Sequence, residues 1–490
     1  MLLSELLQRE GLDGARVTHA SKTDIHAISP DSRRIGPGMI FAALRGTHAD
    51  GRAHIAQAMA QGAAAVLVEH DPAFTPPPGV TCIVAADARA ALAHIARVLT
   101  PRLPTHIAAI TGTNGKTSTA EFLRQIWTLL ALPAATIGTL GALAPCPLPD
   151  CGPVLTTPDS VGLMCLLGAM AQAGVEHVAV EASSHGLEQR RLDGLRPYAA
   201  GFSNLTRDHL DYHGTTEHYR AAKLRLFDTI LPEGGIAAFN ADMDTATCTA
   251  LRMIAARRGL VVRTTGVRGE TLRLMDVRPM PAGQIVQVMT PTGRREMEVP
   301  LVGRFQVDNM LLACAMAGAD DNAPERAVSL LPRLHGVRGR LERVGVLDNG
   351  AAAYVDYAHT PDAIERLLCS LRPHTPGRLV IVMGAGGDRD RGKRPVMGEV
   401  ATRLADRVIV TDDNPRTEVA AAIRAAIMAA APGATEIGDR RQAIATGLGL
   451  LGAGDVLVVA GKGHEQGQTI GHDVLPFDDA TVIRDLMGTE

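Results

Sequence analysis

Short apolar runs of strand length alternate with longer stretches of helical periodicity along almost the whole chain. The pattern is clear at residues 106–111, 175–183, 378–387 and 455–463. Alternation of this kind is typical of α/β units built around mainly parallel sheets. A chain of 490 residues is also long enough for roughly three domains of ~150 residues each. We therefore expect an α/β fold with three domains.

Three segments follow from this pattern. Segment 1–104 contains expected helices at 53–62 and 88–98 and ends in a proline-containing linker. Segment 105–337 starts with a strand, a glycine turn and a helix, and segment 338–490 repeats strand, loop and helix. We expect a small N-terminal α/β domain, a central parallel sheet of the P-loop ATPase type and a C-terminal Rossmann-like domain.

Charge and aromatic content argue against two classes of partner. Lys plus Arg (49) and Asp plus Glu (52) nearly cancel, and aromatic residues make up 3% of the chain, so neither a basic field nor stacking platforms for bases are expected. No apolar run approaches the ~20 residues that span a bilayer. The start of the chain carries Glu5 and no basic stretch, unlike a signal peptide. We expect a soluble, cytoplasmic, monomeric enzyme with no nucleic-acid or membrane partner.

The seven cysteines are scattered, odd in number and free of any C-x-x-C motif. Such spacing is typical of reduced thiols in a cytosolic protein and gives no zinc or disulfide framework.

Several expected strands end in polar or glycine-rich loops, where open α/β sheets bind their ligands. The loop after 106–110 predicts a phosphate site, because two glycines, a lysine and a hydroxyl connect a strand to a helix. Lys116 would contact the β- and γ-phosphates of ATP, and Thr117 would place its hydroxyl on Mg²⁺. Ile110 stands where the general pattern has glycine, and a simple turn that carries a lysine is the alternative. The loop comprises Thr111, Gly112, Thr113, Asn114, Gly115, Lys116, Thr117 and Ser118.

Eight sequence blocks, spread in order over essentially the whole chain, resemble the Mur ligase family. They are GTNGKTS (112–118), TTPD (156–159), EASSHGLEQRR (181–191), SNLTRDHLDYHG (203–214), DYAHTPD (356–362), GGDRDRGKRPVM (386–397), DNPR (413–416) and GKGHE (461–465).

The resemblance implies an ATP-dependent ligase that forms an amide bond through an acyl phosphate in peptidoglycan synthesis. The substrates it implies are UDP-MurNAc-L-Ala-D-Glu, meso-diaminopimelate and ATP, with Mg²⁺ as cofactor. Two kinds of alternative remain open. One is a related ligase that adds L-lysine or extends folate with glutamate; the other is a P-loop nucleotide switch without synthetic activity.

For the metal, the resemblance implies Glu181 and His209 as ligands and Lys223 as a carbamate that helps to hold a second Mg²⁺. Taken alone, Glu181 would be a surface or capping carboxylate and Lys223 a solvated helix lysine. His209 and His213 are four residues apart, so zinc is a further alternative, although Cys partners and an H-E-x-x-H motif are absent from the sequence.

For the nucleotide, the resemblance implies that Asn309 contacts the adenine and that Arg340 reaches the phosphates when the domains close. Asp356 and His359 would lie near the nucleotide. Gln306 replaces the Asn that is more usual in this segment.

For the UDP-sugar substrate, the resemblance implies two groups of residues. Ser32, Thr47, His48 and Ala49 would hold the uridine diphosphate. Leu155 stands where relatives carry Asn. The muramoyl-dipeptide arm would be lined by Thr156, Thr157, Ser183, Gln189 and Arg191.

For the amino-acid substrate, charge type and position agree with the resemblance. Arg389 and Arg416 can bind carboxylates with paired N–H groups, and Asp413 and Glu465 can accept from an ammonium. This pairing suits a second zwitterionic end, as in diaminopimelate, whereas lysine has no distal carboxylate to offset burial of a guanidinium. The DNPR loop could also be a plain Asn-Pro turn. The expected amino-acid site comprises Arg389, Asp413, Asn414, Pro415, Arg416, Gly461 and Glu465.

Overall fold

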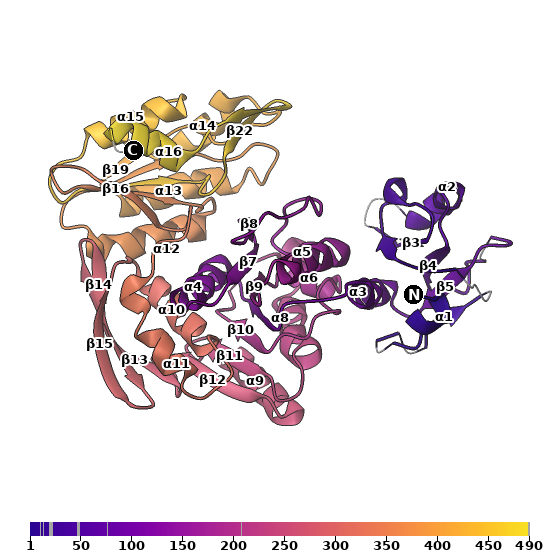
Figure 1. Cartoon of the computed structure of the whole chain (residues 1–490). Helices are drawn as coiled ribbons and strands as arrows, with labels where there is room; N and C mark the ends of the chain where they lie inside the picture. The colour runs from indigo at the N-terminus through magenta and orange to yellow at the C-terminus, as the bar shows by residue number, and fades with distance from the viewer. Residues whose placement is uncertain are drawn as a thin grey trace. The chain divides into compact units, whose positions relative to one another are not determined.

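The computed structural model of the chain describes residues 1–9, 11–12, 14–18, 23–46, 50–75, 77–206 and 208–488. Strands and helices alternate through most of these ranges (Figure 1). The chain divides into two compact units. The first comprises Met1–Thr271 with Leu311–Ala327, and the second comprises Leu272–Met310 with Val328–Glu490.

The first unit opens with a five-stranded sheet in the order β1-β5-β4-β3-β2. Strands β2 to β5 run parallel, and β1 pairs with β5 antiparallel. The side chain of Asp87 accepts hydrogen bonds from the first amides of α3 and so caps this helix at the expected place. The elements are α1 (Leu3–Leu6), β1 (Arg16–Val17), β2 (Ala27–Ser29), η1 (Ser32–Arg34), β3 (Met39–Ala42), η2 (Gly51–His54), α2 (Ile55–Ala60), β4 (Ala65–Glu69), β5 (Cys82–Ala85) and α3 (Ala88–Leu99).

A second sheet of the first unit has the strand order β12-β11-β10-β6-β9-β7-β8. All neighbouring strands are parallel except the β7–β8 hairpin. The strands are β6 (His106–Thr111), β7 (Ala134–Gly138), β8 (Gly141–Leu143), β9 (His177–Glu181), β10 (Ala199–Phe202), β11 (Ile236–Asn240) and β12 (Val261–Gly266). The helical segments are α4 (Lys116–Leu129), α5 (Ser160–Gln172), α6 (Ser184–Glu188), α7 (Leu210–His213), α8 (Thr216–Arg225), η3 (Leu226–Ile230) and α9 (Thr245–Arg258).

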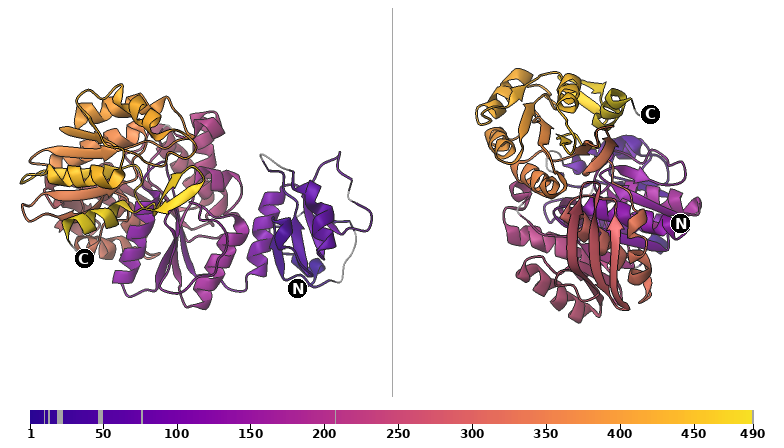
Figure 2. Two further views of the ribbon diagram at one scale, coloured as in Figure 1. Left: turned by 90° about the horizontal axis from the view of Figure 1, so that it is seen from above. Right: turned by 90° about the vertical axis from the view of Figure 1, so that its left-hand side faces the viewer.

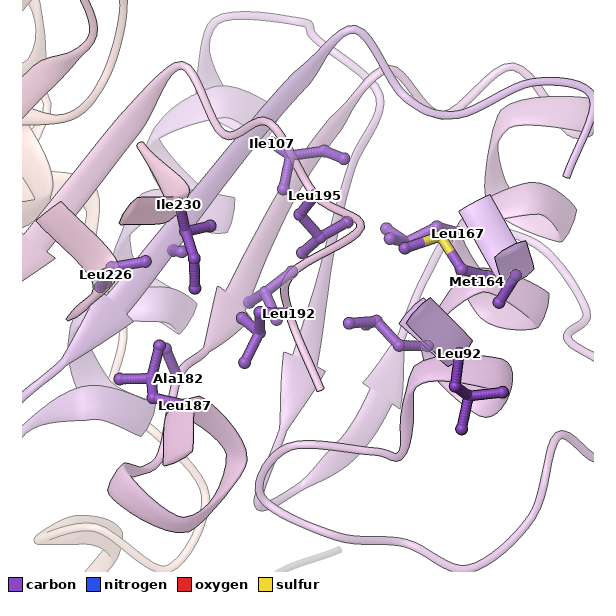
Figure 3. Packing of buried hydrophobic residues seen from close by; sticks show 14 of the residues in the cluster. Leu92, Ile107, Met164, Leu167, Ala182, Leu187, Leu192, Leu195, Leu226 and Ile230 are labelled. Atoms are coloured by element: carbon purple, nitrogen blue, oxygen red, sulfur yellow. The ribbon is translucent and has the colours of Figure 1, made fainter. Parts of the chain in front are cut away.

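One apolar cluster runs through both sheets of the first unit. Leu92 of α3 lies near Met164 and Leu167 of α5, while Leu187 and Leu192 continue the cluster past α6 (Figure 3). All five side chains are buried. Burial of this kind is the main stabilising contribution to folding.

The second unit begins with an antiparallel meander of β13 (Leu272–Met280), β14 (Gly283–Thr290) and β15 (Gly293–Val299), whose long strands lie side by side in Figure 2. His374 joins the meander to the rest of this unit. Its Nδ1 hydrogen-bonds the carbonyl of Met280 at 2.8 Å, and its Nε2 accepts from the amide of Gly303 at 3.0 Å. The imidazole is therefore held neutral, in agreement with burial, which lowers its pKa. Helix α10 (Arg304–Ala315) and helix α11 (Ala323–Val328) follow in the chain, where residues 311–327 belong to the first unit.

A six-stranded sheet in the order β16-β17-β21-β18-β19-β20 completes the second unit. It is parallel except for edge strand β16. The strands are β16 (Glu342–Val346), β17 (Ala352–Asp356), β18 (Leu379–Met383), β19 (Arg407–Val410), β20 (Thr435–Glu436), β21 (Val456–Ala460), and the separate hairpin β22 (Gly467–Ile470) and β23 (Asp473–Pro476). The helices are η4 (Leu331–Arg333), α12 (Pro361–Leu371), η5 (Arg372–His374), α13 (Lys393–Leu404), α14 (Ala420–Met428), α15 (Arg440–Gly449) and α16 (Asp479–Met487).

The expectation that all cysteines are free thiols is wrong at two positions. Cys151 and Cys165 form a disulfide with a Cα–Cα distance of 6.0 Å. The loop after β8 folds back onto the first turn of α5, where Gly162 leaves room for the carbonyl of Cys151. This long-range approach brings the two residues together although they are 14 apart in sequence. Within the described ranges, none of the helices has the length and apolar character required to cross a bilayer.

Helices α15 and α16 share a fully buried ion pair between Arg440 and Asp479, whose side chains are both 0% exposed. We predict that Asp479→Ala lowers the free energy of unfolding by about 3–5 kcal/mol, because it leaves a buried guanidinium without its counter-charge. Urea denaturation of the full chain measures this. The matched control is Asp485→Ala, which removes an exposed pair with Arg441 on the same two helices and should cost less than about 1 kcal/mol. Equal losses in the two variants would contradict the assignment.

Candidate active site

The loop between β6 and α4 has the backbone shape of a phosphate-binding loop. Gly112 and Gly115 adopt positive φ values of 144° and 83°, and Gly115 is the N-cap of α4. A side chain at Gly112 would collide with Ser203 Oγ. The amide of Thr113 donates to the carbonyl of Asn204 at 2.8 Å, which fastens the loop to the segment after β10. The helix N-terminus therefore faces a loop that only glycine can form.

Two lysines converge on one carbonyl of this loop. Lys116 Nζ donates to Gly112 O at 3.0 Å and to Thr113 O at 2.9 Å, and Lys223 Nζ donates to the same Gly112 O at 2.7 Å. Lys223 comes from α8, so the two lysine side chains approach the loop from different helices. The predicted residues Lys116 and Lys223 are thus brought together.

Lys223 is not the solvated helix lysine that its local sequence suggests. Its side chain is 1% exposed and lies 4.5 Å from the centroid of the Tyr219 ring. Burial, with a smaller contribution from the charge of Lys116, lowers the pKa of Lys223 well below its usual value. Helix α8 has a weak apolar stripe, so its sequence hides the fact that this face packs against the phosphate loop.

Glu181 is likewise buried and is not the surface carboxylate that its local sequence suggests; it is 2% exposed. Its Oε2 accepts from Thr117 Oγ1 at 3.1 Å and from Thr139 Oγ1 at 3.2 Å, and its Oε1 accepts from the amide of Thr139 at 2.8 Å. The hydroxyl of Thr117 and the carboxylate of Glu181 are oxygen ligands of the kind that Mg²⁺ prefers. Thr117, Glu181 and the phosphate loop therefore fit a magnesium–nucleotide site.

His209 lies at the start of α7 with a positive φ of 52° and an exposed side chain. Its ring stacks edge-on against His185 at 5.0 Å. His213 is instead buried, and both of its nitrogens are engaged, Nε2 by Ser184 Oγ at 2.9 Å and Nδ1 by Glu188 at 2.9 Å. In the part of the chain that the structure describes, no three His, Cys, Asp or Glu side chains are arranged to hold a metal.

Four residues expected to bind the muramoyl-dipeptide arm form one hydrogen-bonded group. Thr157 Oγ1 donates to the carbonyl of Glu181 and accepts from the amide of Ser183. Arg191 donates from Nη1 to the carbonyl of Thr157 and from Nη2 to Gln189 Oε1 at 2.7 Å. Burial lowers the pKa of Arg191. Through Thr157, this group is therefore joined to the backbone carbonyl of Glu181.

The remaining residues expected for this substrate are less closely connected. Thr156 Oγ1 lies 3.1 Å from Thr139 Oγ1, whereas the Leu155 side chain is exposed to solvent. Ser32 is buried, and its hydroxyl donates to Gln57 Oε1 at 3.1 Å. Thr47, His48 and Ala49 lie outside the described residues.

In the second unit, the residues expected near the nucleotide gather at the end of β17. The guanidinium of Arg340 lies 4.7 Å above the Tyr357 ring, and His359 contacts the same ring. The Asp356 carboxylate accepts from the amides of Leu341 and Ala358, and burial raises its pKa. Burial lowers the pKa of His359.

Asn309 is buried on α10 and donates to Gln306 Oε1 at 3.3 Å. Gln306 in turn donates to the carbonyl of Arg340 at 3.2 Å. Gln306, which departs from the family pattern, therefore links Asn309, the expected adenine contact, to Arg340, the expected phosphate contact.

Most residues of the expected amino-acid site also meet. Asn414 Nδ2 donates to Glu465 Oε2 at 2.8 Å, and a side chain at Gly461 would collide with Asp413 Oδ2. Arg416 has a positive φ of 50° and donates from Nη1 to the carbonyl of Gly387 at 2.8 Å. The carbonyl of Pro415 lies where Gly387 leaves space for it. Arg389 is exposed and hydrogen-bonds only its neighbour's carbonyl, at Asp388, within the described ranges.

Several residues of the site had no role in the sequence-based prediction. Thr139 binds both oxygens of Glu181, Asn204 fastens the phosphate loop, and Lys462 lies buried beside Asn414. Asn204 and Lys462 stand inside the blocks SNLTRDHLDYHG and GKGHE, so the motif was visible although the individual role was not. Thr139 has no comparable signal, because a lone threonine after a strand is common.

Comparison with known proteins identifies the family. Residues 24–112 match the catalytic domain of the Mur ligase family, residues 110–317 match the Mur ligase middle domain, and residues 339–463 match the glutamate ligase domain of Mur ligases. The chain belongs to the Mur ligase family. The expected family is therefore confirmed, and the chain is an ATP-dependent ligase.

Curated Mur ligases resemble the chain over nearly its full length. It is 50% identical over 467 residues to the UDP-N-acetylmuramoyl-L-alanyl-D-glutamate--2,6-diaminopimelate ligase of Mesorhizobium japonicum, covering 95% of this chain and 96% of that protein. It is 49% identical over 471 residues to the ligase of the same name from Caulobacter vibrioides, covering 95% and 96%. A solved structure of a ligase of this name superposes with a TM-score of 0.72 and 32% identity, covering 100% and 99% of the two chains. The expected three-domain α/β fold is thus confirmed.

We predict that Gly112→Ala raises the KM for ATP at least ~10-fold, because the new methyl group displaces Ser203 and opens the phosphate loop. Steady-state kinetics with varied ATP measures this. Gly174→Ala is the matched control: Gly174 also has a positive φ, of 82°, but an added Cβ meets no described atom within 4 Å. This control should lose about 1 kcal/mol of stability and keep its KM for ATP. An unchanged KM in Gly112→Ala would contradict the assignment.

Proposed function

We propose that this Mur ligase joins meso-2,6-diaminopimelate to UDP-N-acetylmuramoyl-L-alanyl-D-glutamate, with conversion of ATP to ADP and phosphate. The observation that carries the proposal is the 50% identity, over 95% of the chain, to a ligase whose name states this reaction. The reaction belongs to the cytoplasm, which supplies ATP, and we propose a monomer as the working form.

In the proposed reaction, an oxygen of the D-glutamate γ-carboxylate attacks the γ-phosphorus of ATP. The bond from that phosphorus to the bridging oxygen breaks, which gives an acyl phosphate and ADP. The diaminopimelate amine then attacks the acyl carbon and loses a proton, and inorganic phosphate leaves as the amide forms. Activation is needed because a free carboxylate has no leaving group that an amine could displace at neutral pH.

The phosphate loop supports the first step. Its backbone amides and the N-terminus of α4 suit the negative charge of the phosphates. Lys116, which donates to the carbonyl of Gly112 in this structure, would donate to the phosphates instead when ATP is bound. Thr117 and Glu181 would hold Mg²⁺, with His209 and a carbamate on Lys223 as further ligands. A bound Mg²⁺ would neutralise the charge that develops during phosphoryl transfer.

The group of Thr157, Ser183, Gln189 and Arg191 supports binding of the dipeptide arm. Because Thr157 donates to the backbone carbonyl of Glu181, an arm bound by this group would carry its γ-carboxylate close to the phosphate loop. Proximity of this kind is a large part of catalysis in phosphoryl transfer, because the reacting atoms must be in line. Ser32, with Thr47, His48 and Ala49, is proposed to hold the uridine diphosphate.

We propose that the site selects diaminopimelate because it offers charged groups for both the carboxylate and the ammonium at the distal end of this substrate. Arg416, with Arg389, would bind the distal carboxylate, and Asp413 with Glu465 would bind the distal ammonium. L-lysine has the ammonium but no distal carboxylate, so it would leave Arg416 without a counter-charge. The desolvation of an unpaired guanidinium opposes lysine binding.

We predict that phosphate release requires both UDP-N-acetylmuramoyl-L-alanyl-D-glutamate and meso-diaminopimelate, and that kcat/KM falls at least ~100-fold with L-lysine, the loss expected when a charged hydrogen-bond partner is missing. A coupled phosphate assay measures this. Equal rates would favour a lysine-adding ligase. Activity with folate and glutamate would favour a folate-extending ligase, and nucleotide binding without turnover would favour a nucleotide switch.

We also propose that Lys223 is carbamylated. The lowered pKa of its amine, caused by burial, provides the neutral nitrogen that adds to CO₂; a C–N bond forms and one proton leaves. The product is an anion beside the phosphate loop, where an ammonium would repel Mg²⁺.

We predict that removal of CO₂ and bicarbonate lowers the activity of the native enzyme and that added bicarbonate restores it. Lys223→Ala should be at least ~100-fold less active, as expected from loss of a metal ligand, and should not respond to bicarbonate. Carbon-13 NMR of enzyme in labelled bicarbonate reports the carbamate directly. A fully active Lys223→Ala enzyme without a bicarbonate effect would rule the modification out.

A further inference from the structure

Lys462 is a buried lysine to which the proposed reaction assigns no role. It follows β21 in the loop 461–466, and its side chain is 0% exposed. Its Nζ donates to Asn414 Oδ1 at 3.2 Å, to Glu465 Oε2 at 3.3 Å and to the carbonyl of Gly467 at 2.5 Å. An ammonium has three N–H groups, so each one has an acceptor.

The three acceptors belong to three different parts of the site. Asn414 lies in the DNPR loop after β19, Glu465 in the loop after β21, and Gly467 at the start of the β22–β23 hairpin. A single buried charge therefore connects the two strand-end loops to the hairpin that lies against them. Buried charges are costly unless they are paired and hydrogen-bonded, and here all three donors meet this condition.

Lys462 also decides which way the Asn414 amide faces. An ammonium only donates, so it must meet the amide oxygen and not the nitrogen. The same oxygen accepts from the amide of Thr469 at 2.9 Å. The Asn414 nitrogen is thereby turned toward Glu465, to which it donates at 2.8 Å.

Glu465 is held in turn by these two donors. Its Oε2 accepts from both Lys462 and Asn414, while Oε1 has no hydrogen-bond partner among the residues that the structure describes. A carboxylate fixed by one oxygen and open at the other is oriented to accept from a ligand ammonium. The side chain is one-third exposed, so the open oxygen is reachable.

The hairpin that Lys462 contacts also shapes Arg416. The amide of Arg416 donates to the carbonyl of Thr469 at 3.1 Å, and the amide of Gly471 donates to the carbonyl of Arg416 at 2.7 Å. These bonds hold Arg416 at its positive φ, a conformation that residues other than glycine rarely adopt. Lys462 thus supports both charge types that the amino-acid site presents.

We propose that Lys462 is a positioning residue for the amino-acid substrate: it orients Asn414 and Glu465 and anchors the hairpin behind Arg416. This inference rests on the proposed function, because it assumes that these residues bind the incoming amino acid. It adds a determinant of affinity that makes no contact with the substrate itself.

The use of lysine in this chain supports a specific requirement at this position. Lysine stands at only five positions, 22, 116, 223, 393 and 462, whereas lysine and arginine together number 49. Arginine has a planar guanidinium with five donors, which cannot direct three bonds to acceptors around one point. A compact ammonium is the group that this geometry needs.

The test is Lys462→Met, which keeps the length of the side chain and removes the charge and donors. We expect the KM for meso-diaminopimelate to rise at least ~10-fold, the loss associated with charged hydrogen bonds. The KM values for ATP and for the UDP-dipeptide should stay within about twofold, because the Lys462 ammonium donates to none of their expected ligands. Steady-state kinetics with each substrate varied in turn measures all three.

Arg378→Met is the matched control. Arg378 pairs with Asp455 at 2.7 Å at the other end of β21, so its loss perturbs the same strand without reaching the site. It should leave the KM for diaminopimelate unchanged. An equal rise of this KM in both variants, or an unchanged KM in Lys462→Met, would overturn the proposal.

A double-mutant cycle with Glu465→Gln distinguishes positioning from general stability. If Lys462 acts through Glu465, the fold increase in the KM for diaminopimelate in the double variant should be well below the product of the fold increases in the two single variants. Multiplicative effects would overturn the proposal. Because the double variant leaves no unpaired carboxylate at residue 465, its kinetics can be measured even if Lys462→Met folds poorly. A KM for diaminopimelate equal to that of the wild-type enzyme in the double variant would also overturn the proposal.

Failure of the proposed function looks different. In that case the wild-type enzyme itself shows no phosphate release that depends on diaminopimelate. A normal wild-type enzyme with an unaffected Lys462→Met variant refutes the role of Lys462 alone.

Discussion

The carbonyl oxygen of Gly112 is the point from which the nucleotide end of this enzyme is organised. It accepts from two lysines, Lys116 of α4 and Lys223 of α8, at 3.0 and 2.7 Å. Burial, and to a smaller extent the neighbouring charge of Lys116, lowers the pKa of Lys223 at this shared acceptor. The loop conformation, the position of α8 and the unusual chemistry proposed for Lys223 therefore depend on one another.

Strands and their polar ends were predictable because buried parallel strands are continuous apolar runs bounded by glycine and polar residues. The runs at 106–111 and 455–463 became β6 and β21 in this way. The meander β13–β15 and the hairpin β22–β23 were not expected. Most side chains of β13, β15 and β23 are exposed, so these strands lack the continuous apolar run of a buried parallel strand. Turn sequences at Pro281-Ala-Gly283 and Pro291-Thr-Gly293 were the available clues.

The sequence motifs predicted which positions belong to the candidate site, but they did not predict which side chains hydrogen-bond one another within it. Sequence blocks gave no indication that Thr139 binds both oxygens of Glu181, or that Lys462 turns the amide of Asn414. Such contacts join loops that are far apart in the chain, so no local pattern encodes them. For the same reason, the burial of Lys223 and the pairing of Cys151 with Cys165 contradict what their own neighbourhoods suggest.

The two units are interleaved along the chain, and this has a consequence for synthesis. Residues 311–327 belong to the first unit, where Trp127 and Tyr198 donate to the carbonyls of Ala317 and Met316. During translation, the meander of residues 272–299 is therefore synthesised before residues 311–327, the last segment of the first unit. The meander cannot pack into its own unit until residues from 328 onward, which complete that unit, have been synthesised. Until that part of the chain has been made, the meander lacks the apolar surfaces of its own unit, so folding of the two units is coupled in time.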